Sequence, residues 1–234
     1  STLFISIMWI LYYELDTFAI ARFFGPEKVA IYAVGFAVLS LLRSLFGTLF
    51  SPFSARFNHF VGLNDPQGLR SLYRSVIILT MPFVIFPIVS LVLLMNPFVN
   101  CWVGHQYSKS IIIAQILILG FIYGFFSYPT GILLMAQKNL KMLYLSSAIL
   151  PIIYWAGIIF TVQYWELTSF ALFKFLALTA NGILYFFIAL QFLDISVRNF
   201  GKKILGPMVI PLAFLILVLL YLHQFMPIEK GVIN

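Results

Sequence analysis

Long apolar stretches alternate with short polar ones along the whole chain. A helix needs about 20 apolar residues to cross about 30 Å of hydrocarbon. Stretches of this kind predict seven membrane-spanning helices, at about 3–24, 29–51, 75–95, 110–136, 143–164, 167–192 and 204–225. Because lipid offers no partner to a backbone N–H or C=O group, all of them are expected to be helices.

The polar connections between these stretches differ in length. Residues 25–28 indicate a tight reversal after the first span, since they contain a Gly-Pro pair. Only Trp165 and Glu166 separate the fifth span from the sixth, which predicts a hairpin. Pro97 is expected to end the third span, and residues 52–74 are expected to form the longest loop.

The composition excludes several classes of protein. Apolar residues make up 62% of the chain and charged residues 9%, with a mean hydropathy of +1.04. Soluble domains contain about 25% charged residues, so a soluble enzyme or a nucleic-acid-binding module is excluded, and no nucleic acid is expected as a partner. The single cysteine, Cys101, cannot form an internal disulfide. The first residue is Ser rather than Met, without a basic leader, which suggests a fragment or a trimmed chain and no cleavable signal peptide.

The basic residues gather on one side of the predicted membrane. The opposite side holds Lys28, Lys109 and Lys230, with Arg22 at a helix end. Positive charge marks the cytoplasmic side, so the N-terminus is expected in the cytoplasm and the C-terminal tail outside. The basic side carries eight of these residues: Arg56, Arg70, Arg74, Lys138, Lys141, Arg198, Lys202 and Lys203.

Four ionisable residues fall inside predicted spans, where charge is costly and by default suggests function. They are Glu14, Asp16, Arg43 and Lys174. Glu14 and Asp16 are about 200° apart on a helix, so we expect one to face a wet cavity and the other a neighbouring helix or polar partner. The functional interpretation is a carboxylate that couples transport to an ion or a proton; the alternative is a hydrogen bond that joins helices.

A polar stripe surrounds Arg43 on the second span. Ser40, Arg43, Ser44, Gly47 and Ser51 share one helical face, and the rest of the helix is apolar. Such a stripe is typical of a water-lined cavity. The alternative is close helix packing by small residues, with Arg43 reaching out to the cytoplasmic headgroups.

A second stripe lies on the sixth span, where Lys174, Asn181 and Tyr185 share a face. It too predicts a cavity, and the alternative is Lys174 reaching the interface with its long stem. A face of small residues on the fourth span is expected to pack against another helix rather than bind a ligand: Gly120, Gly124, Ser127 and Gly131.

The chain carries no nucleotide-binding or catalytic motif, and its loops are short. We therefore expect no enzyme and no cofactor. Polar stripes that face a central cavity fit a secondary transporter best.

Four segments resemble the polysaccharide transporters. Residues 16–25 (DTFAIARFFG) and 29–33 (VAIYA) resemble their seventh helix and the turn after it. Residues 58–75 resemble the cytoplasmic loop that follows, and 100–107 (NCWVGHQY) a Trp-Val-Gly segment. Residues 137–141 (QKNLK) are similar to the loop before the next helix. These transporters form a branch of the multidrug/oligosaccharidyl-lipid/polysaccharide exporter superfamily, and the O-antigen flippases are the nearest members.

The resemblance implies an all-α membrane bundle that is one lobe of a two-lobe transporter. Residues 1–192 would form the six-helix C-terminal lobe, and 193–234 a basic cytoplasmic loop, an additional helix and a short tail. The implied protein is a flippase of the bacterial inner membrane for undecaprenyl-diphosphate-linked oligosaccharide. Its implied partners are that lipid-linked oligosaccharide, membrane lipids, H⁺ or Na⁺, the missing N-terminal lobe and the polysaccharide polymerase machinery.

Physical reasoning assigns roles to the candidate residues. A diphosphate needs cations in a hydrated cleft to cross a bilayer, and Arg and Lys both bind phosphate. The cavity is expected to contain Arg43, Lys174, Ser40, Ser44, Asn181 and Tyr185, with Glu14 and Asp16 coupling to the ion. Two alternatives stay open: a multidrug or cation antiporter of the same superfamily, which predicts an acidic lumen, and a membrane assembly protein that transports nothing.

Overall fold

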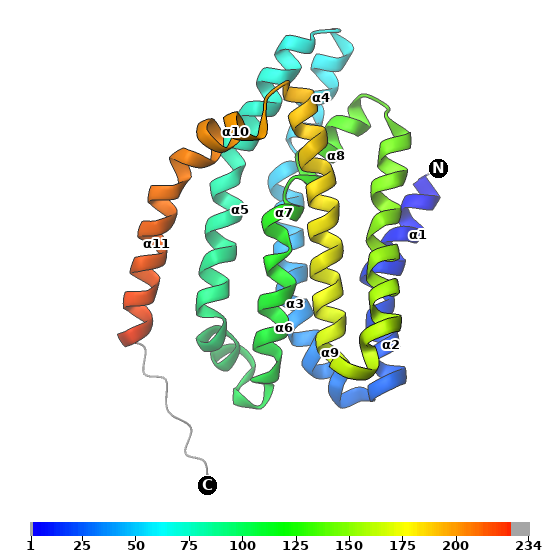
Figure 1. The fold of residues 1–234 in the computed structure, drawn as a ribbon, viewed down its shortest axis with the longest axis vertical. Helices are drawn as coiled ribbons and strands as arrows, with labels where there is room; N and C mark the ends of the chain where they lie inside the picture. Colours follow the sequence, from blue (N-terminus) through cyan, green and yellow to red (C-terminus); the bar gives the residue numbers. More distant parts are fainter. Residues whose placement is uncertain (1, 226–234) are drawn as a thin grey trace.

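The computed structural model describes residues 2–225, and these form helices joined by short connections, without a strand (Figure 1). The α-helices are α1 (Thr2–Tyr13), α2 (Leu15–Phe24), α3 (Pro26–Phe50), α4 (Phe53–Gly62), α5 (Pro66–Val103), α6 (Lys109–Leu119), α7 (Phe121–Gly124), α8 (Ser127–Ala136), α9 (Leu140–Leu193), α10 (Val197–Phe200) and α11 (Gly206–Phe225). A 3₁₀ turn at His105–Tyr107 and a π-helical turn at Gly201–Leu205 complete the described chain.

The predicted all-α membrane bundle is confirmed. Four helices are long and apolar enough to cross a membrane, or five if the bent pair from Lys109 to Ala136 counts as one span. The longest, α9, reverses direction at Glu166, so it supplies two antiparallel limbs (Figure 1). This reversal is the hairpin expected between the fifth and sixth spans. The seventh expected span corresponds to α11, an apolar helix shorter than the four candidate spans.

Local residue choices set several helix ends. Gly25 has φ 82°, a positive angle that glycine adopts without strain. The proline after it begins α3, so the chain reverses there as expected. Asp65 caps α5 by accepting a hydrogen bond from the Gly68 amide at 2.9 Å. Glu166 adopts φ 44° and ψ −125° at the hairpin, a conformation rare for a residue with a side chain.

Two sequence predictions about connections are wrong. Residues 52–74 are not a loop, because they contain α4 and the first two turns of α5. Pro97 does not end the third span, since α5 continues to Val103 with Pro82 and Pro87 also inside it. A helix that ended inside the bundle or the lipid would leave backbone N–H and C=O groups without hydrogen-bond partners, so α5 continues through its prolines.

The helix that begins at Lys109 is broken near its middle. Its two parts meet at an angle of 44°, with Phe125 and Phe126 at the break. The second limb of α9 touches the break closely at Gly182, where an added Cβ would lie 2.3 Å from the backbone carbon and oxygen of Tyr123. Gly182 therefore permits the backbone of α9 to approach the break.

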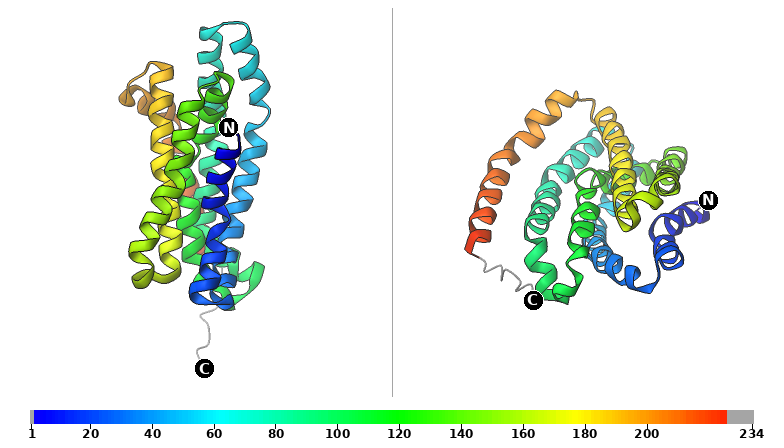
Figure 2. Two further views of the ribbon diagram at one scale, coloured as in Figure 1. Left: turned by 90° about the vertical axis from the view of Figure 1, so that its right-hand side faces the viewer. Right: turned by 60° about the horizontal axis from the view of Figure 1, so that its bottom comes forward.

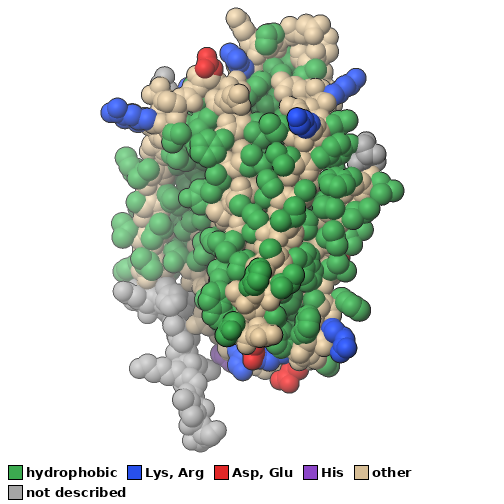
Figure 3. All heavy atoms as spheres, turned by 45° about the vertical axis from the view of Figure 1, so that its right-hand side comes forward, with side chains coloured by type: hydrophobic (Ala, Val, Ile, Leu, Met, Phe, Trp, Pro, Cys, Tyr) green, Lys and Arg blue, Asp and Glu red, His purple; other side chains and the backbone are tan. Residues whose placement is uncertain are grey.

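Apolar and charged side chains occupy different zones of the surface (Figure 3). Large apolar side chains cover the middle of the visible face, and charged side chains gather at its two ends. The connections of one end, around 51–65, 137–139 and 194–205, lie together in Figure 1, and we call this the basic end. Of the cations assigned to the opposite end, Lys230 lies outside the described residues. This zoning is that of a multi-pass membrane protein.

Helices α1 and α2, α3, α6 and α9 pack in turn against one another, and α5 and α11 extend the bundle on one side (Figure 2). Helix α3 packs chiefly against α6, and α1 packs against α9. Helix α11 lies at one edge, beside α5. This arrangement leaves a space between the side chains of α1, α3 and α8. Ser40, Arg43 and Ser44 of α3 border it, and Asn181 and Tyr185 of α9 line an adjoining pocket.

Candidate functional site

Arg43 lies within α3, a helix long and apolar enough to cross a membrane, about 10 Å of helix rise from the end at Phe50. Its side chain is half-buried, and its guanidinium carbon lies 4.4 Å from the ring centre of Tyr13 and 6.0 Å from that of Trp9. A guanidinium above aromatic faces is stabilised by a cation–π interaction. Among the described residues, no carboxylate forms an ion pair with Arg43. The cation is therefore held beside these rings, and no carboxylate of the described residues competes for it.

An open groove of about 580 Å³ surrounds Arg43. The polar stripe expected on the second span forms one wall, through Ser40, Arg43, Ser44 and Gly47. The facing wall comes from α1 and α8, and it is mainly aromatic: Trp9, Ile10, Tyr13, Glu14 and Tyr128. The groove thus combines one cation, small hydroxyl groups and large rings.

Glu14 also borders this groove. It occupies the single residue between α1 and α2, where the helical hydrogen bonding changes, and its side chain is exposed. Among the described residues it has no ion-pair partner. The groove therefore holds one carboxylate as well as one guanidinium, on opposite walls.

Asp16 points away from the groove into a buried ion pair. Its Oδ2 accepts hydrogen bonds from the Lys174 ammonium and, at 2.8 Å, from the Tyr32 hydroxyl, and its Oδ1 accepts one from the Thr17 amide. Both members of the pair are fully buried. The pair joins α2 to the second limb of α9, and the Tyr12 hydroxyl adds a 2.8 Å hydrogen bond to the carbonyl of Lys174.

The expectation that Lys174 lines the cavity is not met. Its side chain is fully buried, and its Nζ lies 4.6–5.5 Å from the ring centres of four aromatic residues: Tyr12, Tyr13, Phe36 and Tyr154. It does not reach the interface either. A carboxylate on another helix, 158 positions away in the chain, satisfies the ammonium where it lies, so a stripe on one helix could not reveal its partner.

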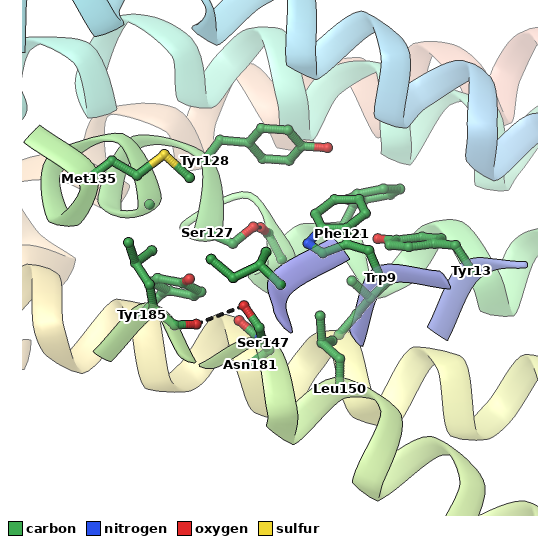
Figure 4. Close-up of a pocket in the computed structure, with 15 residues that line it drawn as sticks. Trp9, Tyr13, Phe121, Ser127, Tyr128, Met135, Ser147, Leu150, Asn181 and Tyr185 are labelled. Carbon is green, nitrogen blue, oxygen red and sulfur yellow. Dashed lines mark hydrogen bonds between the residues drawn. The ribbon is translucent and has the colours of Figure 1, made fainter. Parts of the chain in front are cut away.

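Asn181 and Tyr185, the other members of that stripe, line a second and smaller pocket beside the groove (Figure 4). The Asn181 Nδ2 donates to the carbonyl of Ser146 at 2.7 Å, and the Tyr185 hydroxyl is 2.7 Å from the Ser146 hydroxyl. The stripe thus divides, with Lys174 in the buried pair and the two uncharged residues at a pocket.

One more ion pair lies at the end opposite the basic end. Lys28, near the start of α3, contacts Glu166 at the α9 hairpin, with 2.7 Å between the charged atoms. The hydrogen bond from Lys28 and its positive charge lower the pKa of Glu166. This surface pair links the α2–α3 turn to the hairpin.

Comparison with known proteins gives a family match over part of the chain. Residues 1–112, which include α1, α2, α3 and the groove wall around Arg43, match the profile of a family described as "Polysaccharide biosynthesis protein". The resemblance to polysaccharide transporters is thereby confirmed. The match covers 112 of the 234 residues. No curated protein and no solved structure matches the chain. The family points to a role in polysaccharide export.

Several residues at the site are not recognisable from the sequence. Trp9 and Tyr13 lie one helical turn apart below Arg43, and Tyr128 faces them from α8. Sequence alone assigns all three to the aromatic residues of the membrane interface, the usual place for Trp and Tyr. Ser127 and Gly131 also border the smaller pocket, although a helix-packing role was expected for them. The four-residue spacing of Trp9 and Tyr13, which places both on one face of a helix, was the only sequence signal that they share a site.

Proposed function

We propose that this chain carries a lipid-linked oligosaccharide across the bacterial inner membrane by alternating access, and that the diphosphate of the lipid binds at Arg43. The observation that supports this most is a guanidinium at membrane depth, outside any ion pair of the described residues, in an open groove of about 580 Å³. The family match supports polysaccharide export as the general role.

The electrostatic argument starts from the cost of the crossing. A diphosphate that enters hydrocarbon without a partner loses its hydration, which makes the passage prohibitively slow. A guanidinium offers two parallel N–H donors to a phosphate. The hydroxyl groups of Ser40 and Ser44 flank Arg43 on the same wall and offer further donors. The lipid tail would stay in the bilayer while the headgroup occupies the groove.

The ion that drives transport is proposed to act at Glu14. This carboxylate borders the same groove and has no ion-pair partner among the described residues, so it can bind H⁺ or Na⁺ when the groove is hydrated. Asp16 is the equal candidate for this role on sequence alone. It would first have to leave Lys174, so we assign the buried pair the task of joining α2 to α9.

The groove forms one wall of a passage, and the resemblance implies a second six-helix lobe as the opposite wall. The excess of basic residues at the basic end supports a cytoplasmic position for that end. The multidrug antiporter remains the second candidate, because Glu14 in the groove is a group that binds organic cations. Arg43 in the same groove disfavours it, since the guanidinium repels such a ligand.

The test is surface polysaccharide in cells that depend on this protein. Arg43→Ala removes a charge-assisted contact worth about 1.5–3 kcal/mol, or about 10- to 100-fold in affinity. We expect it to abolish most surface polysaccharide at normal protein levels, while Arg43→Lys retains part of it. The matched control is Arg56→Ala, which removes an exposed cation at the basic end. Full export by Arg43→Ala would contradict the proposal and favour the assembly protein.

A further inference from the structure

Two arginines border a pocket of about 260 Å³ at the basic end. Arg70 and Arg74 lie one turn apart near the start of α5, which places both on one helical face, about 6 Å apart along the axis. The hydroxyl-bearing Ser71 lies on the same face and also borders the pocket. No residue that lines this pocket lines the Arg43 groove, so the two are separate features of the molecule.

The facing wall of the pocket comes mainly from the segment that joins α9 to α11, residues 194–205, which we call the elbow (Figure 1). Ile195 and Ile204 line the pocket from the elbow. Phe200 anchors the elbow to the bundle, because it is fully buried and its ring centre lies 5.9 Å from that of Phe126. The wall that faces the two arginines is therefore fixed in place.

The elbow contains a π-helical turn at Gly201–Leu205. Such turns are rare and frequently lie at functional sites. In this turn Ile204 is 4% exposed and lines the pocket, whereas Lys202 is exposed. The turn thus adds an apolar wall to the pocket and a further cation to the surface beside it.

The guanidinium groups of Arg70 and Arg74 have no anionic partner. Neither forms an ion pair within the described part of the chain. Asp65 is occupied as the cap of α5, and Asp194, the first residue of the elbow, contacts neither arginine as an ion pair. Like charges one helical turn apart repel each other, so an anion bound between the two arginines would be favoured.

The pocket lies where the surface changes from polar to apolar. The apolar stretch of α5 begins two residues after Arg74, and its next turn exposes Ile78 and Leu79 by 44% and 58%. On the other side of the pocket, α11 begins directly after the elbow and exposes Ile210 by 80%. The cations therefore lie at the level of lipid headgroups, next to side chains suited to contact hydrocarbon. A molecule with an anionic head and apolar chains matches both zones.

We propose that this pocket binds the headgroup of an anionic phospholipid, with its phosphate at Arg70, Arg74 and Ser71. Basic pockets between helices at the cytoplasmic surface are common sites for such headgroups, and a guanidinium offers paired N–H donors to a phosphate. The acyl chains extend along the exposed apolar side chains of α5 and α11. The bound lipid links the start of α5 to the elbow, and the site is independent of Arg43 and of the transported substrate.

The test is lipid binding to the purified full protein in uncharged detergent micelles. The two probes are fluorescent phosphatidylglycerol and fluorescent phosphatidylcholine with the same acyl chains, of which only the first carries a net negative charge. Because two arginines face one anionic headgroup, we expect wild-type protein to bind phosphatidylglycerol about 10- to 30-fold more tightly. Equal affinities for the two lipids would overturn the proposal.

Three variants locate the site, and all their substituted side chains are exposed, so the fold should be kept. Arg70→Gln with Arg74→Gln should remove the preference for phosphatidylglycerol. Ser71→Trp keeps both charges but fills the pocket, and it should remove most of the preference. The matched control, Arg56→Gln with Lys141→Gln, deletes two cations of the basic end that do not border the pocket and should keep it. Equal losses in the two glutamine pairs, or an unchanged preference in Ser71→Trp, would overturn the pocket.

Further measurements identify the source of the phosphate. Glycerol 1-phosphate should not displace phosphatidylglycerol at equal concentration, because it lacks acyl chains; displacement would assign the pocket to a soluble phosphate and overturn the lipid site. Arg70→Gln with Arg74→Gln should leave the affinity for polyprenyl diphosphate unchanged, and Arg43→Ala should leave the preference for phosphatidylglycerol unchanged. A loss in either measurement would assign the pocket to the transported substrate and overturn this inference. Failure of Arg43→Ala to weaken polyprenyl diphosphate binding would contradict only the proposed function.

Discussion

Replacement of Asp16 or Lys174 alone should destabilise the protein strongly. Lys174→Met leaves a fully buried carboxylate with only the Tyr32 hydroxyl and the amide and hydroxyl of Thr17 as partners. Asp16→Asn leaves a fully buried ammonium that contacts aromatic rings and has no carboxylate. Removal of one member of a buried ion pair typically costs about 3–5 kcal/mol. We expect Asp16→Asn to be the costlier change, because Asp16 loses one of four donors in Lys174→Met, whereas Lys174 loses its only hydrogen-bond acceptor among the described residues.

The double variant, Asp16→Asn with Lys174→Met, should recover most of this loss. The amide oxygen introduced at position 16 would still accept hydrogen bonds from Tyr32 and Thr17, and the methionine side chain would fill an aromatic cage with an apolar chain. Buried pairs replaced by apolar groups of similar size are often neutral in stability. We therefore expect the double variant to lie within about 2 kcal/mol of wild type, so the costs of the two single changes do not add.

The assay is reversible unfolding in mixed micelles, with the free energy of unfolding measured for wild type, both single variants and the double variant. The reasoning would be refuted by single variants that each lose less than about 1 kcal/mol, or by additive losses in the double variant. Polysaccharide export by the double variant then tests its function. Because neither residue borders the groove, we expect export to persist, whereas its loss would restore Asp16 as the ion-coupling group.

Two further predictions concern stability. Gly182→Ala should lower the free energy of unfolding by about 1–3 kcal/mol, because its Cβ would meet the backbone of Tyr123. Gly131→Ala is the control and should not lower it, since nothing lies within 4 Å of the added Cβ. Equal losses for the two variants in the same micelle titration would contradict the close approach of α9 to Tyr123. The pair of Glu166 with Lys28 should stabilise the protein above about pH 4.5 and lose this effect as the pH falls through the lowered pKa of Glu166. Thermal unfolding from pH 7 to pH 3.5 should therefore show a smaller loss on acidification for Glu166→Gln than for wild type, and identical pH profiles would exclude the contribution.

Features that depend on nearby residues in the chain were predictable from the sequence. The length of the apolar stretches located the long helices, and the Gly-Pro pair located the α2–α3 reversal. The angular separation of Glu14 and Asp16 anticipated that they would lie in different environments, one at the groove and one buried. The stripe around Arg43 was also readable, because one helix supplies that whole wall.

Features that depend on contacts between distant segments were not predictable from a single sequence. The partner of Lys174 lies on α2, and a helical stripe contains no information about which helix will face it. The aromatic wall of the groove was missed for the same reason, since Trp9 and Tyr128 meet only after α1 and α8 have packed. The course of α5 through Pro97 depends on its neighbours and on the lipid, which overcome the local preference of proline to end a helix.

The proposed function depends above all on Arg43, as the cation that allows an anionic headgroup to cross the membrane. Its role can be measured as the rate at which a fluorescent polyprenyl diphosphate moves between the leaflets of vesicles that contain the protein. We expect Arg43→Met to slow this movement at least about tenfold, while Arg56→Met leaves the rate at the wild-type value. Equal rates for Arg43→Met and wild type would contradict the proposed role of Arg43.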